Sequence, residues 1–143
     1  MGAGSPDGSD ADVSPLGIVQ GHAYSLLDVC EIDGTKLVQL RNPWGNEVEW
    51  KGPWGDNSAE WTERRRRIVY DRMKQKGWEQ TDIGKDDGIF WMAFSDFVKN
   101  YEEIYLCRFF DEDHTEISYS SEWSVAKRTA GGCGNTDGVA QNP

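Results

Sequence analysis

The sequence predicts an α+β fold in which an antiparallel sheet carries helices on its surface. Three observations support this class. Two β-rich runs flank an Asp-Gly pair at 33–34, an apolar run at 88–94 has the length of a buried strand, and a charged stretch at 57–76 has helix start and stop signals. The 143 residues suffice for about one domain.

The first predicted element is a β-hairpin. The runs HAYSLLDVCEI (22–32) and TKLVQLRN (35–42) surround Asp33-Gly34, and Asp-Gly between such runs favours a tight turn. The stretch NPWGNEVEWKGPWGDN (42–57) follows, and its prolines and glycines interrupt any long regular element. We expect it to be an ordered loop pinned by its aromatic side chains.

A helix is predicted to follow this loop. Asn57 or Ser58 can cap its start, and it should run to about Lys76 because Gly77 lies just beyond. Its apolar residues are sparse, so we expect it at the surface. Four consecutive arginines at 64–67 lie within it among acidic neighbours, which favours a solvated, salt-bridged face over a phosphate site.

Two further strands and a short helix complete the predicted fold. GIFWMAF (88–94) is typical of a buried strand, and IYLCRFF (104–110) of another. Between them, Ser95 can cap a short helix that ends near Asn100. Residues 1–15 have almost no apolar side chains and are rich in Gly, Ser, Pro and Asp, so we expect a flexible lead-in there.

Composition limits the possible partners and compartments. Acidic residues outnumber basic ones by 25 to 15, for a net charge of -10, which disfavours nucleic acid and anionic lipid and suits cations. Three cysteines, Cys30, Cys107 and Cys133, have neither disulfide-framework nor zinc-site spacing, which fits a reducing, intracellular (cytoplasmic) location. No apolar run approaches the ~18 residues of a membrane span, and no signal peptide is recognisable.

One polar pair at the open end of the hairpin is a candidate site. His22 opens the first strand and Asn42 closes the second. A two-residue turn at Asp33-Gly34 would place their side chains on opposite faces, because side chains alternate along strands. A three-residue loop with Gly34 left-handed would place them on one face as diagonal neighbours, ~7–8 Å apart at the backbone and within reach of a hydrogen bond.

Such a pair has the chemistry of a general base. An Asn oxygen that accepts from one imidazole nitrogen fixes the ring tautomer, and the other nitrogen can then exchange a proton with a thiol. Trp44 follows Asn42 by two residues and has the apolar bulk to cover the bond between Asn42 and His22. Judged from the residues alone, a single strand histidine is more often structural than catalytic.

Five segments occur in this order along the chain: GHAYS (21–25), RNPWG (41–45), EVEWKGPWGD (47–56), DGIFWMAF (87–94) and TAGGC (129–133). Together they resemble the second protease subdomain of the calpain family, and more distantly the papain-like cysteine proteases. Relative to animal calpains, one extra residue, Asn46, separates the NPWG and EVEW segments. At this position and at the apolar Ile89 the sequence is similar to plant-type calpains.

The resemblance implies a domain organisation. Residues 16–110 would form calpain-type protease subdomain 2, built on the twisted antiparallel sheet of the papain-like second lobe with surface helices. Residues 111–143 would be a linker and the truncated start of the β-sandwich domain that follows the protease core. The Gly-rich tail lacks a finishing element, so we expect the chain to end inside something larger.

The resemblance also implies roles for the candidate pair. His22 would be the general base and acid, Asn42 its orienting group and Trp44 the shield. The nucleophilic cysteine would lie upstream, in the first protease subdomain, because the three cysteines of this chain do not match its surroundings and are interpreted as structural. The implied partners are protein substrates, that first subdomain and the following β-sandwich domain, and this chain alone is expected to be inactive.

Calcium is the cofactor that the resemblance implies. The ligands would be the side chains of Glu49, Asp56 and Asp87 and the backbone carbonyl of Lys85. Hard oxygen donors on irregular loops suit Ca²⁺, which takes ~6–8 ligands. Ile89 stands where calpains commonly carry Glu, so Asp86 or water would have to fill that position. Without the resemblance, an ordinary solvated acidic surface is the simpler interpretation.

The leading hypothesis is therefore part of an intracellular calcium-dependent cysteine endopeptidase. A second hypothesis is a non-catalytic calpain-like module for calcium sensing or protein interaction, since the chain lacks a recognisable nucleophile. A third is an unrelated Trp-rich peptide- or sugar-binding domain, which would require His22 and Asn42 to be dispensable and far apart.

Overall fold

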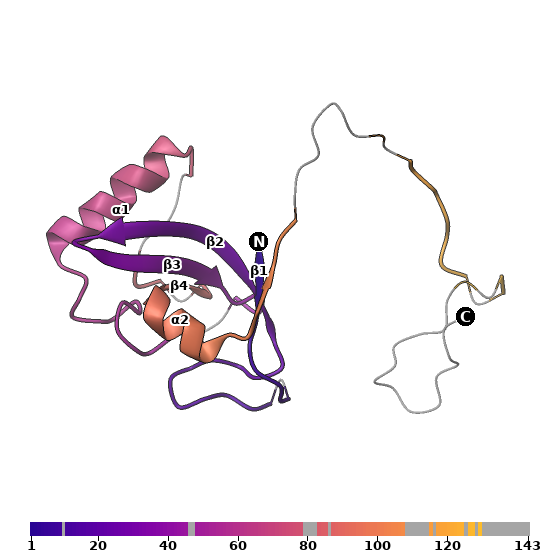
Figure 1. Ribbon diagram of the computed structural model, residues 1–143, viewed down its shortest axis with the longest axis horizontal. Coiled ribbons are helices and arrows are strands. Elements are labelled where there is room, and N and C mark those ends of the chain that lie inside the picture. The colour runs from indigo at the N-terminus through magenta and orange to yellow at the C-terminus, as the bar shows by residue number, and fades with distance from the viewer. Residues whose placement is uncertain are drawn as a thin grey trace. The chain divides into compact units, whose positions relative to one another are not determined.

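The computed structural model describes residues 1–9, 11–45, 48–78, 83–85, 87–107, 115, 117–124, 126, 127 and 129 (Figure 1). The chain divides into two compact units, Met1–Cys107 and Arg108–Pro143. In the second unit the described residues contain no strand, and Thr129 closes a turn by donating its hydroxyl to the Glu122 carbonyl at 2.7 Å. Most of the region predicted to start a β-sandwich lies outside the described residues.

The first unit contains an antiparallel sheet of five strands in the order β4-β3-β2-β1-β5. The strands are β1 (Gly2–Gly4), β2 (Ala23–Ile32), β3 (Thr35–Arg41), β4 (Ile89–Ala93) and β5 (Glu103–Tyr105). The helices are α1 (Glu63–Gln75) and α2 (Phe94–Asn100). The predicted α+β class with an antiparallel sheet is confirmed.

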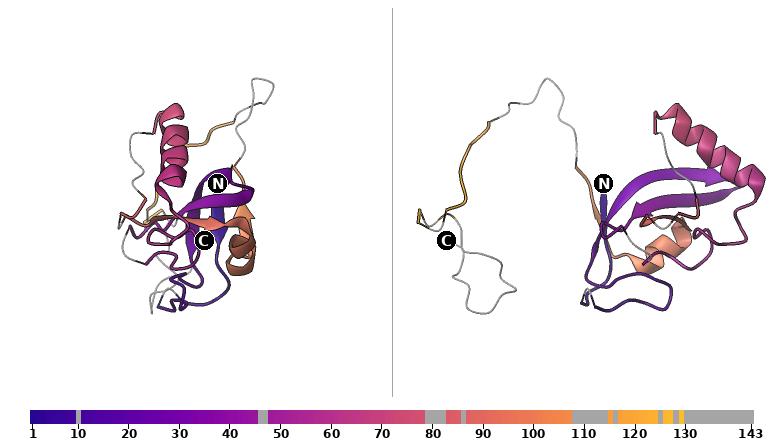
Figure 2. Two further views of the ribbon diagram at one scale, coloured as in Figure 1. Left: turned by 90° about the vertical axis from the view of Figure 1, so that its left-hand side faces the viewer. Right: turned by 180° about the vertical axis from the view of Figure 1, so that it is seen from behind.

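The two helices cover opposite faces of this sheet (Figures 1 and 2). On one face, α2 helps to close a core that we call the α2-side cluster; its members include Tyr24, Leu26, Val38, Leu40, Phe90, Met92, Phe97 and Tyr101. On the other face, α1 helps to close the α1-side cluster: Ile32, Leu37, Trp54, Trp61, Val69, Met73, Trp91 and Ala93. Each face of the sheet is therefore buried against its own helix.

Strand β1 contradicts the predicted flexible lead-in at residues 2–4. Ala3 is fully buried and pairs with Tyr24 of β2 on one side and Ile104 of β5 on the other. A strand between two neighbours satisfies its backbone groups on both edges, so it can be ordered without large apolar side chains. Amino-acid composition alone does not reveal order that comes from backbone pairing with two neighbouring strands.

The β2-β3 hairpin turns as predicted at Asp33-Gly34, and of the two loops considered for it the two-residue turn is present. Both residues have positive φ angles, 50° and 79°, and Ile32 pairs directly with Thr35, which defines a two-residue turn of the I′ type. The register shifts instead by one residue between Leu26 and Asp28, where Leu27 forms a β-bulge. The extra residue thus lies within β2 and not in the turn.

Helix α1 begins later than predicted. Its N-cap is Thr62, whose hydroxyl accepts from the Arg65 amide, so the caps predicted at Asn57 or Ser58 are wrong. The preceding segment is held in turns because the Trp61 indole donates to the Trp54 carbonyl at 2.9 Å. The predicted end of the helix near Lys76 and Gly77 is confirmed.

Helix α2 follows β4 without a capping side chain. Ala93 is both the last residue of β4 and the N-cap of α2, so the prediction of a cap at Ser95 is wrong, whereas the end at Asn100 is confirmed. Strand β5 spans Glu103–Tyr105, so it overlaps the strand predicted at 104–110 only at residues 104 and 105. Residues 108–110 lie outside the described part of the chain.

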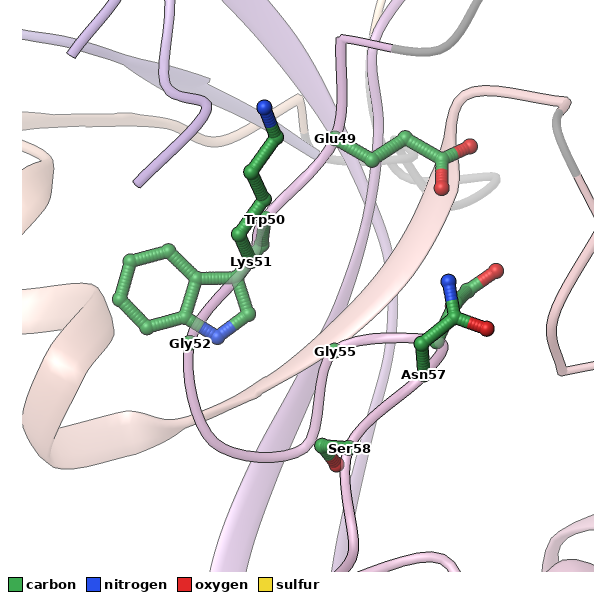
Figure 3. A pocket seen from close by; sticks show the side chains of 8 residues that line it. Glu49, Trp50, Lys51, Gly52, Gly55, Asn57 and Ser58 are labelled. Atoms are coloured by element: carbon green, nitrogen blue, oxygen red, sulfur yellow. The ribbon is translucent and has the colours of Figure 1, made fainter. Parts of the chain in front are cut away.

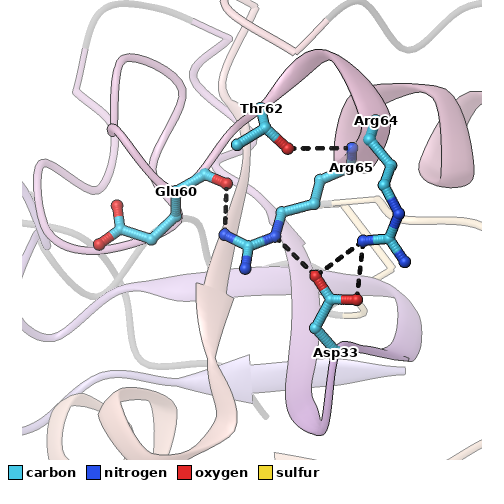
Figure 4. Close-up of polar contacts among 5 residues, drawn as sticks. All are labelled: Asp33, Glu60, Thr62, Arg64 and Arg65. Carbon is cyan, nitrogen blue, oxygen red and sulfur yellow. Dashed lines mark hydrogen bonds and ion pairs between the residues drawn. The ribbon is translucent and has the colours of Figure 1, made fainter.

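The arginine run of α1 makes specific contacts (Figure 4). Arg64 and Arg65 both donate to the carboxylate of Asp33 at the hairpin turn, at 2.9 Å each. Arg66 donates instead to the Ile83 carbonyl at 2.7 Å. The salt-bridged face predicted for this run is found at its first two arginines, and Arg66 departs from it by binding a backbone carbonyl.

Candidate active site

His22 and Asn42 meet at the open end of the hairpin. His22 precedes β2, Asn42 follows β3, and the imidazole Nε2 lies 3.0 Å from the Asn42 Oδ1. The bulge at Leu27 brings them together, because with this extra residue the even-numbered residues that precede it share a sheet face with the even-numbered residues of β3. The hydrogen bond between His22 and Asn42 that the sequence allows is therefore present. It depends on a bulge within β2 and not on a three-residue loop at the turn.

The contacts of Asn42 determine which imidazole nitrogen carries the proton. Asn42 is fully buried; its Nδ2 donates to the Val48 carbonyl at 3.1 Å, and its Oδ1 accepts the Trp44 amide at 3.1 Å. These two partners fix the amide orientation, so Oδ1 faces the ring and Nε2 must be the donor. Nδ1 then carries the lone pair of the neutral imidazole, as a general base requires.

Ser5 holds the backbone of His22. The His22 amide donates to the Ser5 Oγ at 2.9 Å, and the His22 carbonyl accepts from the Ser5 amide at 3.0 Å. Gly21, just before, has a φ of +59°, and a Cβ there would lie 2.4 Å from the Gly8 carbonyl oxygen, so only glycine fits. Sequence reasoning missed Ser5 because the order of the N-terminal segment comes from distant strands.

Two aromatic rings contact the imidazole. The Trp44 ring lies 4.6 Å from it between centroids, and the Tyr24 ring lies 5.1 Å away at right angles. Trp44 is 41% exposed, so it covers the imidazole from the solvent side, while Tyr24 belongs to the α2-side cluster. This position suits the shielding role predicted for Trp44, which stays a prediction.

Cys30 does not have the features of an activated nucleophile. Cys30 is half-buried against the α1-side cluster, on the sheet face opposite to Tyr24 and Leu26. Burial raises the pKa of its thiol to about 11, whereas a nucleophilic cysteine needs a lowered pKa. Cys107 is exposed beyond β5, and Cys133 lies outside the described residues.

The acidic residues predicted as calcium ligands form hydrogen bonds with backbone amides in the loops before β4, and we call this region the acidic site. Asp56 Oδ2 accepts the Gly84 amide at 2.9 Å, Glu49 Oε1 accepts the Gly88 amide at 2.6 Å, and Asp87 Oδ1 accepts the Ile89 amide at 3.0 Å. A cavity of about 220 Å³ opens beside them; its lining includes Glu49, Trp50, Asp56, Asn57 and Ser58 (Figure 3).

These carboxylates share an unfavourable electrostatic environment. Burial, together with the charge of Asp56, raises the pKa of Glu49 to about 7. Burial likewise raises the pKa of Asp56 to about 6, where the hydrogen bond from Gly84 opposes the shift and the charge of Asp87 adds to it. Such a site favours either protonation or a bound cation.

The predicted ligands do not form a compact metal centre. Within the part of the chain that the structure describes, no group of three or more His, Cys, Asp or Glu side chains is arranged to hold a metal ion. Lys85 is among the described residues and Asp86 is not, while Ile89 begins β4. The donor chemistry therefore fits a hard cation, but the three carboxylates are not gathered around one point.

Gly88 connects the acidic site to the His-Asn pair. Its carbonyl accepts the Asn42 amide at 2.8 Å, and its own amide donates to Glu49. Its φ is +80°, and a Cβ there would lie 2.7 Å from the Asn42 carbonyl oxygen, so glycine is required. One backbone position thus contacts both candidate sites.

An antiparallel sheet that presents a hydrogen-bonded His-Asn pair has the arrangement expected for the imidazole half of a cysteine protease site. Comparison with known proteins agrees with this class. The profile of the family described as "Calpain family cysteine protease" matches residues 1–108. The chain belongs to the calpain family of cysteine proteases, as its sequence motifs predict.

Relatives from plants and animals extend this result. The chain is 50% identical over 143 residues to "Calpain-type cysteine protease ADL1" of Oryza sativa subsp. japonica, covering all of this chain and 6% of that protein. It is 50% identical to "Calpain-type cysteine protease DEK1" of Arabidopsis thaliana with the same coverage. "Calpain clp-1" of Caenorhabditis elegans is 38% identical over 151 residues, covering 89% of this chain and 18% of that protein.

The chain thus spans a small share of the length of these relatives. In the residues that the structure describes, neither helix has the length and apolar character to span a membrane.

Proposed function

We propose that this chain supplies the imidazole and the carboxamide of a Cys-His-Asn site that hydrolyses peptide bonds, and that the thiol comes from another lobe of the protease. The observation that carries the proposal is the 3.0 Å contact between His22 Nε2 and Asn42 Oδ1. The contacts of Asn42 support it, because they leave Nδ1 as the basic nitrogen.

The catalytic cycle follows from this tautomer. Nδ1 of His22 takes the proton of the incoming thiol, and the thiolate attacks the carbonyl carbon of the scissile peptide bond. The imidazolium then returns the proton to the leaving amine. Water, activated by the same nitrogen, hydrolyses the acyl-enzyme. Throughout the cycle Asn42 accepts the Nε2 hydrogen and holds the ring in place, and Trp44 limits the access of water to that bond.

The proposed substrates and partners follow from the assignment of the imidazole and carboxamide to this chain and of the thiol to another lobe. Proteins or peptides would be cleaved, and a cysteine-bearing lobe would be the obligatory partner, with the β-sandwich domain following in the longer protease. A reducing intracellular compartment suits a thiol-dependent site, and the Cys30 side chain is itself a thiol. On its own, the chain is expected to be inactive because Cys30 has a raised pKa and lies on the other face.

The Asn42→Ala variant tests the proposed site. In a polypeptide that joins this chain to a cysteine-bearing calpain-type lobe, which we call the complete core, we expect kcat for a peptide substrate to fall about 10²-fold, because the ring loses its fixed tautomer. The matched control is Asn100→Ala, which removes an amide that donates to the Asp96 carbonyl at the end of α2. Equal kcat values for the two variants would refute the assignment.

We also propose that Ca²⁺ binds at the acidic site, with oxygen ligands from Glu49, Asp56, Asp87 and the Lys85 carbonyl. The raised pKa values of Glu49 and Asp56 support this, because burial and, to a smaller extent, neighbouring carboxylates disfavour their charged forms, and a divalent cation would offset both effects. Bound calcium would supply positive charge that draws these loops together. Since Gly88 contacts both Glu49 and Asn42, the cation would also stabilise the backbone beside the catalytic pair.

Thermal unfolding as a function of pH tests the acidic site. The folded-state pKa values of about 7 for Glu49 and about 6 for Asp56 exceed the ordinary values of 4.5 and 3.8, so the native state binds more protons than the unfolded state between them. In calcium-free buffer, Tm should therefore fall as pH rises from about 4 to about 7. Calcium added above pH 7 should recover the loss.

The Glu49→Gln variant should flatten this pH dependence and weaken the calcium response, whereas Glu31→Gln, at an exposed position of β2, should change neither. A wild-type Tm that rises over the same pH interval would contradict the inferred electrostatics. A Tm at pH 7.5 that calcium leaves unchanged would contradict the cation site alone.

A further inference from the structure

His22 lies just outside the regular part of the hairpin. The ladder between β2 and β3 ends at the pair of Ser25 with Arg41, so it stops short of His22. The backbone of Asn42 is held from the other side, because its amide donates to the Gly88 carbonyl at 2.8 Å. The contact between the His22 and Asn42 side chains therefore depends on a separate support for the backbone of His22.

Strand β1 is in the right place to provide that support. The register of β1 with β2, continued by one position, places Ser5 opposite His22. In an antiparallel ladder, pairs that exchange two main-chain hydrogen bonds recur at every second position. The Leu26 amide donates to the Met1 carbonyl at 2.8 Å, so Ser5 and His22 belong to the same series of hydrogen-bonded pairs.

At this pair the Ser5 hydroxyl replaces a main-chain group. The Ser5 amide donates to the His22 carbonyl at 3.0 Å, as the ladder requires. In a regular pair the His22 amide would donate to the Ser5 carbonyl, but here it donates to the Ser5 Oγ at 2.9 Å. The Ser5 hydroxyl in turn donates to the His22 carbonyl at 3.1 Å. Both polar groups of the His22 backbone thus contact the Ser5 side chain.

The chain leaves the regular ladder at this point. The next residue is Pro6, whose carbonyl accepts the Gly21 amide at 2.7 Å. Two successive amides before β2, those of Gly21 and His22, are therefore bound by two successive residues after β1. The support is itself anchored, because the Gly4 carbonyl accepts the Glu102 amide at 3.0 Å on the other edge of β1.

We propose that Ser5 is a positioning residue: its hydroxyl holds the backbone of His22 and thereby keeps the imidazole Nε2 within hydrogen-bonding distance of the Asn42 Oδ1. Without the hydroxyl, the partly buried His22 amide loses its acceptor, which is costly, so the backbone should shift. The catalytic consequence rests on the function proposed above, whereas the positioning concerns only the bond between His22 and Asn42. Ser5 takes no part in proton transfer.

Ser14 offers a matched control because it makes the same pair of bonds elsewhere. Its amide donates to the Ile18 carbonyl at 2.8 Å, and the Ile18 amide donates to its Oγ at 2.9 Å. Ile18 is fully buried in the α2-side cluster and is not part of the candidate pair. Ser5→Ala and Ser14→Ala thus remove the same kind of bond, but only Ser5→Ala removes it from the residue that carries the imidazole.

Nitrogen-15 NMR of the imidazole in this chain is the decisive measurement. The chain has two histidines, so the His22 ring signals are identified by their loss in His22→Ala. The wild type should show a single tautomer with hydrogen on Nε2, and Asn42→Ala should show the averaged pattern of an unrestrained ring. We expect Ser5→Ala to shift the ring signals toward that pattern and Ser14→Ala to leave them at the wild-type positions.

Two further substitutions separate the hydroxyl from the bulk of the side chain. Ser5→Thr keeps the hydroxyl, and Ser5→Val has nearly the same shape as Ser5→Thr without it. The ring signals should stay at the wild-type positions in Ser5→Thr and shift in Ser5→Val. This pair also decides the question if Ser5→Ala does not fold.

The proposal is overturned by a folded Ser5→Ala variant with wild-type ring signals, by an equal shift in Ser14→Ala, or by identical ring signals in Ser5→Thr and Ser5→Val. The wild type provides a test that needs no variant. Its His22 amide should exchange slowly with deuterium, because it is bound to the Ser5 Oγ. Exchange at the rate of an unprotected amide would contradict the proposed support.

Kinetics of the complete core separate this proposal from the proposed function. We expect Ser5→Ala to lower kcat about tenfold with KM little changed, because small displacements of a catalytic group are costly. If His22→Ala leaves cleavage unchanged, the proposed function fails, yet the NMR result still decides whether Ser5 positions the ring. If His22→Ala abolishes cleavage and Ser5→Ala changes neither kcat nor the ring signals, the positioning role fails alone.

Discussion

The His22→Ala variant of the complete core is expected to lose peptide cleavage on the order of 10³-fold or more in kcat. The imidazole would form the thiolate and also protonate the leaving amine, so one truncation removes both functions. KM should change little, because the proposed role of the ring is proton transfer and not substrate binding. Initial rates with a fluorogenic peptide, measured over a range of substrate concentrations, give both constants.

The matched control for this variant is His114→Ala, the replacement of the other histidine in the chain. It should retain wild-type kcat. Raising the pH should partly restore the His22→Ala rate, because a thiol can ionise without a base once the pH nears its own pKa. A His22→Ala core that cleaves as fast as the His114→Ala core would show that the imidazole of His22 takes no part in cleavage.

Deletion of Leu27 is expected to straighten β2 and to leave the candidate pair in place. Without the extra residue, Leu26 would directly precede Asp28, and the pairs of Asp28 with Gln39 and of Leu26 with Leu40 would continue in one regular ladder. His22 would keep facing Asn42, and Tyr24 and Leu26 would stay in the α2-side cluster. We therefore expect kcat to fall by no more than about tenfold, a loss that small displacements of the catalytic group can cause.

The substitution Leu27→Ala is the control for this deletion, because it removes the half-buried side chain and keeps the residue count. It should lower Tm modestly and leave kcat within about twofold of the wild type, since the register is unchanged. Nitrogen-15 NMR of the imidazole should show one tautomer, with hydrogen on Nε2, in both variants. A deletion variant whose ring signals resemble those of Asn42→Ala would show that the bulge itself is needed for the contact between His22 and Asn42.

Much of the fold could be predicted because its signals are local. The Asp-Gly turn, the strand at Ile89–Ala93 and the end of α1 at Gly77 each depend on residues that are neighbours in sequence. Turn chemistry and strand length act over a few positions, so a pattern of residue types is enough to reveal them. Cap positions were predicted less well, since Thr62 and Ala93 replace the expected residues.

The wrong or missing predictions concern residues whose positions depend on contacts between segments that are distant in the sequence. The start of α1 is set by the packing of Trp61 on Trp54, and β1 is ordered because β2 and β5 pair with both of its edges. Ser5, which holds the backbone of His22, was missed for the same reason. Backbone pairing leaves little trace in composition, since Gly and Ala serve a central strand only when their neighbours are already in place.

The sequence predicted which residues form the candidate site but not how the fold brings them together. The sequence by itself determined the family, the hairpin and the chemistry of His22 and Asn42, because these depend on motifs and on side-chain type. Only the tertiary structure decided that the two side chains share a face, since that depends on a bulge beside Asp28. The bulge lies where a buried carboxylate meets basic residues of a helix more than forty positions away in the chain, and such long-range pairing is not encoded in a local pattern.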